Sequence, residues 1–204
     1  MTSERAAPER REIGVLIVDL ANFTQFVETT EPERTFATLG EYHDAFTPIV
    51  ERHQGIVMDL VGDAVCLMFR ATPAAPDPEL RTVRAALDVQ GSLAALVQGW
   101  KRRGDSIDFG IGVSFGYATL GHVSVAERSE YHVVGATVIV AARLASLARG
   151  GRVFATERLA NDASSVASGT LVAGVEVGGL RQPPRVFELA RRDATPASDP
   201  ASRR

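Results

Sequence analysis

The stretch GIVMDLVGDAVCLMF, residues 55–69, contains two short runs of apolar and β-branched residues on either side of Gly62-Asp63. Two strand-like runs joined by such a pair are typical of a β-hairpin with a tight two-residue turn. A second stretch, IGVLIVDL at residues 13–20, is apolar almost throughout, which indicates a strand buried on both faces and is too short for a helix. We therefore expect a sheet that contains this strand and the hairpin.

Helical patterns surround these strands. Residues 31–54 carry an apolar stripe at spacings of three, four and seven, which predicts a helix that Pro48 kinks or divides. The stripe consists of Phe36, Leu39, Phe46 and Val50. A second helix is predicted over residues 78–103, with Asp77 as its N-terminal cap and Gly104 as the residue that ends it.

The second half of the chain adds further strands and two helices. We expect two strands within residues 107–123, a strand at 129–135, a mostly buried helix at 137–148, a strand at 152–156, a short helix at 157–162, and a closing hairpin from 170–178 and 184–190. Strands interleaved with helices, several of them joined by hairpins, favour an α+β domain with a mixed sheet that helices cover on one face.

The length and composition fit one globular domain. The chain has 204 residues, of which 45% are hydrophobic and 23% charged, enough for one core and too few for two comfortable domains. Residues 1–11 and 191–204 mix charge with Ala and Pro and lack apolar periodicity, so we predict disordered tails on either side of a folded domain at 12–190.

Several classes of protein are disfavoured. No apolar stretch reaches the roughly 20 residues of a membrane helix, and the first twelve residues lack the apolar core of a signal peptide. The single cysteine, Cys66, has apolar neighbours and is expected to be a small core residue. A net charge of −3 provides no footprint for sequence-independent nucleic-acid binding. We expect a cytoplasmic protein with neither a membrane nor a nucleic acid as partner.

Two carboxylates stand out as candidates for chemistry. Asp19 ends the apolar strand, where a carboxylate is costly to bury unless it is paired or bound to metal. Asp63 taken alone is an ordinary turn residue, because Gly-Asp is common turn chemistry. If the strand and the hairpin are neighbours in one sheet, the two carboxylates meet at one end of it and form an oxygen site suited to Mg²⁺ or Mn²⁺.

Four segments together resemble a known family. VLIVDLANFTQF, GIVMDLVGDAVCLMF, IGVSFGYATLGHV and EYHVVGATVIVAARLASLA, in this order and spacing, look like the catalytic domain of class III adenylate and guanylate cyclases. The closing LRQPPRVFEL resembles the terminal hairpin of that family. The resemblance implies a ferredoxin-like α+β domain that dimerises head to tail, with each active site shared between two protomers.

The resemblance also assigns roles to residues. Asp19 and Asp63 match the two metal aspartates, which implies two Mg²⁺ or Mn²⁺ ions per site. Phe23 and Thr24 match the segment that cradles the triphosphate. Arg143 matches the arginine that neutralises charge at the transferred phosphoryl group, although an arginine on a helix is also an ordinary surface residue.

Four positions depart from the family pattern. Asp59 replaces a lysine that reads adenine, and His132 replaces the residue, commonly Asp or Thr in adenylate cyclases, that also contacts the base. Ile139 replaces the transition-state asparagine, and a phosphate-contacting lysine falls on Gly178. Losing one preorganised donor typically lowers the rate by ~10²–10³-fold, so activity below that of a complete family member is expected.

These observations lead to one main hypothesis and several alternatives. The main hypothesis is a homodimeric cyclase that converts a nucleoside triphosphate, commonly ATP in the family, to a 3′,5′-cyclic nucleotide and pyrophosphate for signalling. Asp59 accepts hydrogen bonds and does not donate them, which leaves GTP or a pyrimidine nucleotide open as substrate. The alternatives are a degenerate module that binds nucleotide and metal or only dimerises, and a heterodimer whose partner supplies the missing residues.

Overall fold

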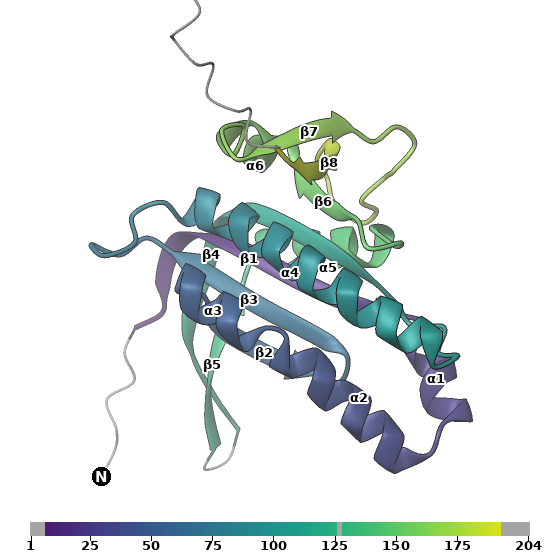
Figure 1. The fold of residues 1–204 in the computed structure, drawn as a ribbon. Helices are drawn as coiled ribbons and strands as arrows, with labels where there is room; N and C mark the ends of the chain where they lie inside the picture. The colour runs from purple at the N-terminus through teal and green to yellow at the C-terminus, as the bar shows by residue number, and fades with distance from the viewer. Residues whose placement is uncertain (1–6, 126–127, 193–204) are drawn as a thin grey trace, which may run out of the picture.

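The computed structural model describes residues 7–125 and 128–192, except for the side chains of residues 59–61, 125 and 128. Within these residues eight strands form one sheet in the order β2-β3-β1-β4-β6-β8-β7, with β5 paired to β4 (Figure 1). The strands are β1 (Glu9–Ala21), β2 (Ile56–Val61), β3 (Ala64–Arg70), β4 (Asp108–Val125), β5 (Arg128–Val134), β6 (Val153–Thr156), β7 (Ala167–Leu171) and β8 (Val186–Arg191). The β4–β6 pair is parallel and the other pairs are antiparallel, so the predicted mixed sheet is confirmed.

Helices lie on both faces of this sheet. They are α1 (Phe23–Thr29), α2 (Pro32–Asp44), α3 (Thr47–His53), α4 (Pro78–Arg102), α5 (Ala136–Leu147) and α6 (Glu157–Asp162). In β1, Leu16 and Val18 pack into the core beneath α4, whereas Val15 and Ile17 pack on the opposite face against α5. The prediction that helices cover one face is therefore wrong. The reason is visible in β1, because its residues 13–18 are buried at successive positions and such a run needs a cover on both sides.

The hairpin and the divided helix are found where the sequence predicts them. β2 and β3 pair antiparallel on either side of Gly62-Asp63, and Gly62 adopts the left-handed conformation with φ 61°. The helical stripe is split between α2 and α3, with Pro48 in the first turn of α3. Phe36, the first residue of the stripe, does not pack in the core, since its side chain is 80% exposed. α2 instead turns Thr38 and Tyr42 to the core, and Phe36 lies on the other side of the helix.

The segment at 107–123 forms one long strand, β4, and the prediction of two strands there is wrong. Its glycines allow another backbone to approach closely. A Cβ atom at Gly112 would lie 2.0 Å from the carbonyl oxygen of Ala141, and one at Gly110 would lie 2.2 Å from that of Ala145. The absence of side chains at these two positions lets the backbone of α5 lie directly on the strand.

The predicted boundaries need adjustment at several ends. β1 begins at Glu9, so residues 9–11 belong to the sheet and not to the N-terminal tail, whereas residues 1–6 and 193–204 lie outside the described residues. The first strand of the closing hairpin, β7, lies earlier than predicted. Asp77 occupies the N-cap of α4 without a side-chain capping hydrogen bond. Among the described residues, none of the helices combines the length and apolarity needed to span a bilayer.

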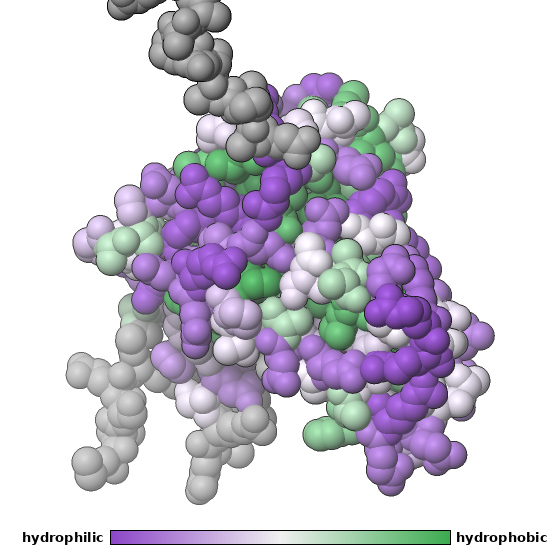
Figure 2. Space-filling view, viewed as in Figure 1, coloured by the Kyte–Doolittle hydropathy of each residue, from purple (hydrophilic) through white to green (hydrophobic). Residues whose placement is uncertain are grey.

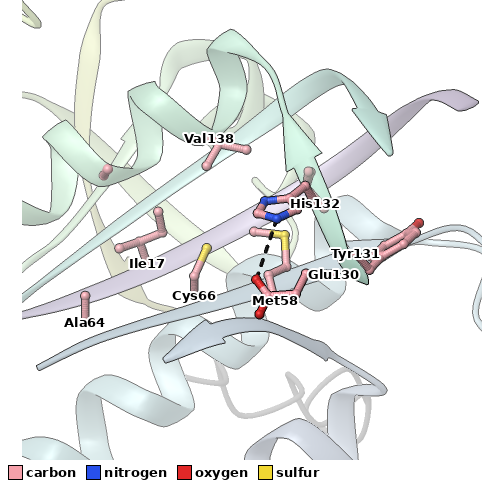
Figure 3. Close-up of a pocket in the computed structure, with 10 residues that line it drawn as sticks. Ile17, Met58, Ala64, Cys66, Glu130, Tyr131, His132 and Val138 are labelled. Atoms are coloured by element: carbon pink, nitrogen blue, oxygen red, sulfur yellow. Dashed lines mark ion pairs between the residues drawn. The ribbon is translucent and has the colours of Figure 1, made fainter. Parts of the chain in front are cut away.

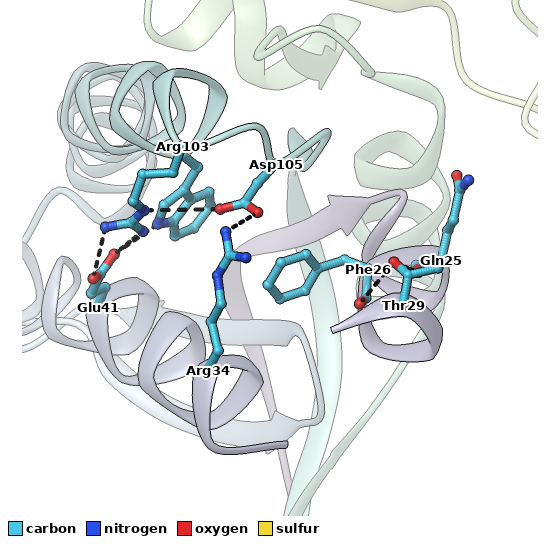
Figure 4. Close-up of polar contacts among 8 residues, drawn as sticks. Gln25, Phe26, Thr29, Arg34, Glu41, Arg103 and Asp105 are labelled. Atoms are coloured by element: carbon cyan, nitrogen blue, oxygen red, sulfur yellow. Dashed lines mark hydrogen bonds and ion pairs between the residues drawn. The ribbon is translucent and has the colours of Figure 1, made fainter. Parts of the chain in front are cut away.

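Polar contacts fix α2 against the end of α4 (Figure 4). Arg34 of α2 forms an ion pair with the buried Asp105, which follows α4. Glu41 accepts hydrogen bonds from Trp100 Nε1 at 2.7 Å and from Arg103 at 2.9 Å. These hydrogen bonds, from Arg103 first and Trp100 second, lower the pKa of Glu41. In the view of Figure 2 the outer side of α2 is largely hydrophilic. The polar contacts of Arg34 and Glu41 therefore hold this helix in place in addition to its buried face.

Candidate functional site

Two carboxylates lie at one end of the central strands. Asp19 is the residue after Val18, which pairs with Val65 of β3, and Asp63 occupies the turn just before β3. Because β1 and β3 run antiparallel, the end of one strand lies beside the start of the other. The structure thus brings together the two aspartates that the sequence singles out, and it does so through strand register.

The two aspartates interact electrostatically. Burial raises the pKa of Asp63, a backbone hydrogen bond lowers it, and the negative charge of Asp19 raises it again, for a net rise above the usual value of 3.8. Placing two negative charges together in a partly buried site costs free energy that a bound cation offsets.

Tyr42 lies close enough to this pair of carboxylates to feel the charge of both. Its side chain is fully buried, and its hydroxyl has no hydrogen-bond partner among the described residues. Burial raises the pKa of Tyr42 well above 10.0, and the charges of Asp63 and Asp19 raise it further. The hydroxyl therefore stays protonated and neutral at the edge of a negatively charged site.

The donor set at this end fits a hard divalent cation. Carboxylate oxygens are the ligands that Mg²⁺ and Mn²⁺ prefer, and Mg²⁺ is commonly held by one or two carboxylates together with substrate phosphates and water. Within the described part of the chain, no group of three or more His, Cys, Asp or Glu side chains is arranged so that it could hold a metal ion by itself. Asp19 and Asp63 thus have the chemistry of a metal site that phosphate oxygens complete.

The sequence reasoning missed Ser146, which also belongs to this end. Its hydroxyl lies 3.3 Å from Oδ2 of Asp19, although the two residues are 127 positions apart. Ser146 belongs to α5, three positions after Arg143. The spacing on the helix is visible in the sequence, but the contact with Asp19 depends on how α5 sits on the sheet.

Phe23 and Thr24 open α1, just after β1. Phe23 is buried and its ring lies 6.0 Å from that of Phe26, so only its backbone is available to a ligand. Thr24 is exposed. Asn22 precedes them in the left-handed conformation, with φ 65°, and its Nδ2 donates to the carbonyl oxygen of Ser106. This bond ties the start of α1 to the segment just before β4.

Arg143 lies beside an open cavity of about 530 Å³. Glu176 and Gly178 line the same cavity, which brings the position of the replaced lysine next to the arginine. One guanidinium nitrogen of Arg143, Nη1, is buried and lacks a hydrogen-bond partner among the described residues. Ile139, one turn earlier on α5, is 49% exposed. This surface therefore offers a forked donor that is not engaged within the described chain.

A second cavity, of about 600 Å³, lies between β2, β3, β5 and α5 (Figure 3). His132 and Met58 border it, and Nε2 of His132 lies 3.8 Å from a carboxylate oxygen of Glu130. The backbone of Asp59 follows Met58 and pairs with Cys66, but the side chain of Asp59 lies outside what the structure describes. Because Cys66 lines the same cavity as His132, the backbone of Asp59 lies next to the wall of that cavity.

Cys66 is part-buried and borders this cavity as well. It packs against the small apolar cluster on the α5 face, which agrees with its expected place as a small core residue. Ala142 borders both this cavity and the one beside Arg143. The two cavities thus meet along one side of α5.

Comparison with known sequences identifies relatives. The family model described as the adenylate and guanylate cyclase catalytic domain matches residues 6–176. Adenylate cyclase 1 of Rhizobium meliloti is 33% identical over 136 residues, which are 66% of this chain and 20% of that protein. An uncharacterised protein of Mycobacterium tuberculosis is 31% identical over 182 residues, covering 87% of this chain and 32% of its own length. The chain therefore spans a third or less of the length of these two relatives.

Solved structures share the fold. The adenylyl cyclase CyaB from P. aeruginosa superposes with a TM-score of 0.84 at 20% identity, over 93% of this chain and 98% of that one. The guanylyl cyclase Cya2 superposes with a TM-score of 0.78 at 25% identity, over 94% and 98% of the two chains. The α+β architecture expected from the sequence is thus that of solved cyclase domains.

Proposed function

This chain belongs to the adenylate and guanylate cyclase catalytic domain family, and from that premise we propose that it is a metal-dependent nucleotidyl cyclase. It converts a nucleoside triphosphate to a 3′,5′-cyclic nucleotide and pyrophosphate, and ATP is the first substrate to test. The observation that carries the proposal is the convergence of Asp19 and Asp63 at the adjoining ends of β1 and β3.

The residues of the site have separate roles in binding metal and in binding the triphosphate. Two Mg²⁺ or Mn²⁺ ions, when bound, lower the pKa of the ribose 3′-hydroxyl and neutralise the triphosphate. Asp19 and Asp63 hold them, and the backbone at Phe23 and Thr24 donates to phosphate oxygens. The 3′ oxygen loses its proton to solvent and bonds to the α-phosphorus. The bond from that phosphorus to the bridging oxygen breaks, and pyrophosphate leaves with the electron pair.

Arg143 stabilises the charge on the α-phosphoryl group as this exchange proceeds. A forked guanidinium in a site that excludes water suits that task, because it donates two hydrogen bonds to the developing charge. We infer that the arginine acts on a nucleotide held by a second copy of the chain, in a head-to-tail homodimer. Arg143 borders an open cavity, and its Nη1 has no hydrogen-bond partner among the described residues, which supports this arrangement.

The base is read in the cavity beside His132. A carboxylate at Asp59 accepts from the N1 and N2 hydrogens of guanine or the N4 amine of cytosine, whereas it cannot donate to adenine. Neutral imidazole has one donor and one acceptor and fits several bases. GTP and the pyrimidine nucleotides are therefore alternative substrates of the same reaction.

A second candidate function rests on Ile139. This exposed side chain, one turn before Arg143, has no hydrogen-bond donor where the family has an asparagine. Gly178 likewise carries no side chain beside Arg143. A catalytically degenerate module that binds nucleotide and metal or only dimerises, or a heterodimer whose other chain contributes the missing donors, would retain the carboxylates and lack these groups.

Product formation tests the proposal. The purified chain is incubated with Mg²⁺ or Mn²⁺ and with ATP, GTP, CTP or UTP in turn, and products are identified by mass spectrometry. We expect a cyclic nucleotide from the unaltered chain, none from Asp19→Ala or Asp63→Ala, and an unchanged yield from Asp162→Ala, which removes an exposed aspartate of α6. No product from any nucleotide would contradict the homodimeric enzyme. Product that forms only with a second cyclase chain would establish the heterodimer.

A further inference from the structure

Helix α5 reaches the end of β1 because β4 carries glycines beneath it. Asp19 pairs directly with Gly110 in the β1–β4 ladder, so both positions face the same side of the sheet. A Cβ at Gly110 would lie 2.2 Å from the carbonyl oxygen of Ala145. The residue after Ala145 is Ser146, and the glycine contact brings this serine within reach of the neighbouring strand.

We propose that Ser146 is a positioning residue for the metal ligand Asp19. Its hydroxyl lies 3.3 Å from Oδ2 of Asp19, and no other hydrogen bond or ion pair of Asp19 occurs among the described residues. A hydrogen bond to one oxygen restricts rotation of the carboxylate and leaves the other oxygen directed outward. Groups that orient ligands in this way typically change metal affinity by ~10–100-fold when they are removed.

The hydroxyl of Ser146 has a second acceptor in reach. The carbonyl oxygen of Ala142, one turn earlier on α5, also lies 3.3 Å away. Serines within helices commonly donate to such a carbonyl, and a serine with no other role would do only this. A carboxylate is the stronger acceptor, because hydrogen bonds to ionised groups are roughly twice as strong as those between neutral groups. The hydroxyl proton therefore goes to Asp19.

The same helix also carries Arg143. Ser146 and Arg143 are three residues apart, and both border the cavity of about 530 Å³. α5 is seated firmly, since Ala141 and Ala145 are buried against the sheet. One rigid element thus orients the carboxylate of this chain's own metal site and presents the guanidinium toward the cavity.

This inference rests on the proposed function, and metal binding tests it without turnover. Mn²⁺ is titrated into the unaltered chain, Ser146→Ala, Ser146→Thr and Asp19→Ala, and free Mn²⁺ is followed by electron paramagnetic resonance. We expect Ser146→Ala to raise the half-saturating Mn²⁺ concentration by roughly 10-fold. Ser146→Thr keeps the hydroxyl and should stay within about 3-fold of the unaltered chain, whereas Asp19→Ala should abolish the binding that depends on this site.

The matched control is Ser168→Ala. Ser168 is an exposed serine of β7 that donates to a backbone carbonyl, so its loss should leave Mn²⁺ binding unchanged. Thermal unfolding of each variant shows that the fold is retained. If Ser146→Ala binds Mn²⁺ like the unaltered chain while Asp19→Ala does not, the positioning role is wrong and the metal site stands. If Asp19→Ala also binds normally, the metal site and the role of Ser146 are both wrong.

Discussion

The two faces of the sheet are packed to different degrees. Beneath α4 a large core encloses fully buried side chains such as Trp100, Tyr42 and Phe69. The face beneath α5 has a smaller cluster, with Ala141 and Ala145 as its helical contacts. The cavities of about 600 and 530 Å³ border α5. Two apolar side chains of this helix, Ile139 and Leu147, are exposed to solvent.

Under the proposed function, this difference separates the part of the molecule that is complete in one chain from the part that a second chain completes. The α4 face buries its apolar side chains within the chain and provides stability. The α5 face leaves Arg143 unpaired at Nη1 and Ile139 half exposed, which suits a surface that a nucleotide and a second chain cover. Asp19 and Asp63 lie where the two parts meet.

The largest effect is expected at Arg143. Arg143→Ala should lower kcat by ~10²–10³-fold, as loss of one preorganised donor does, with little change in thermal stability. In a head-to-tail dimer, mixing Arg143→Ala with Asp19→Ala creates mixed dimers in which one of two sites is intact, so about one quarter of full activity should return. Two inactive variants that stay inactive after mixing would place the arginine and the aspartate of one site on the same chain.

Packing of α5 is the next target. Gly112→Ala places a Cβ 2.0 Å from the backbone of Ala141, so the helix must move and the free energy of unfolding should fall by ~1–3 kcal/mol. Gly91→Ala is the control, because Gly91 lies in α4 with open space around it and the change should stabilise the protein by ~0.5–1 kcal/mol. Urea denaturation measures both, and equal effects would show that α5 does not press on β4.

A smaller effect, an increase in kcat, is expected when a hydrogen-bond donor is introduced on the exposed surface of α5. Ile139→Asn restores a donor at an exposed position and should raise kcat by about 10-fold, less than the full ~10²–10³ because other family residues are also absent. Leu171→Asn, on β7, matches it in exposure, at 48% against 49%, and should leave kcat unchanged. A rate that does not rise above that of the unaltered chain would mean that the missing donor is not what limits catalysis.

The smallest effect concerns the pH dependence of stability that comes from Asp88, a residue of α4. Burial raises the pKa of Asp88, but hydrogen bonds from His53, Arg191 and Arg52 outweigh it, and the net pKa is lowered. A carboxylate with a lowered folded pKa stabilises the protein above its unfolded pKa, near 3.9, and this contribution disappears as pH falls through the folded value. Asp88→Asn should therefore cost about 1 kcal/mol at pH 7 and less below about pH 4. An equal cost at pH 7 and pH 3, measured by chemical denaturation, would contradict this account.

Local patterns predicted much of the fold. Gly62-Asp63 predicted the hairpin, because few residue pairs suit a two-residue turn, and the apolar run that ends at Asp19 predicted the central strand. The same run was apolar at successive positions, so burial on both faces was already implied, yet one covered face was expected. Phe36 belongs to the predicted stripe and is nevertheless exposed, because a stripe of four residues does not decide which side of a helix packs.

The glycines of β4 show a further limit of local reasoning. The glycines within residues 107–123 indicated close backbone approach, which Gly110 and Gly112 confirm, but the sequence did not say which segment approaches. Their role depends on α5, which comes more than twenty residues later. A glycine that makes room for a distant backbone has the same local sequence as one that ends a strand.

By itself, the sequence determined the residue types of the site and the strand ends on which they lie, because turn chemistry and apolar runs act over a few residues. Only the tertiary structure decided that Ser146 lies beside Asp19, that Gly178 shares a cavity with Arg143, and that His132 borders a cavity with β2. These contacts join segments far apart in the chain. They follow from strand register and from how closely α5 packs on the sheet, which no local pattern specifies.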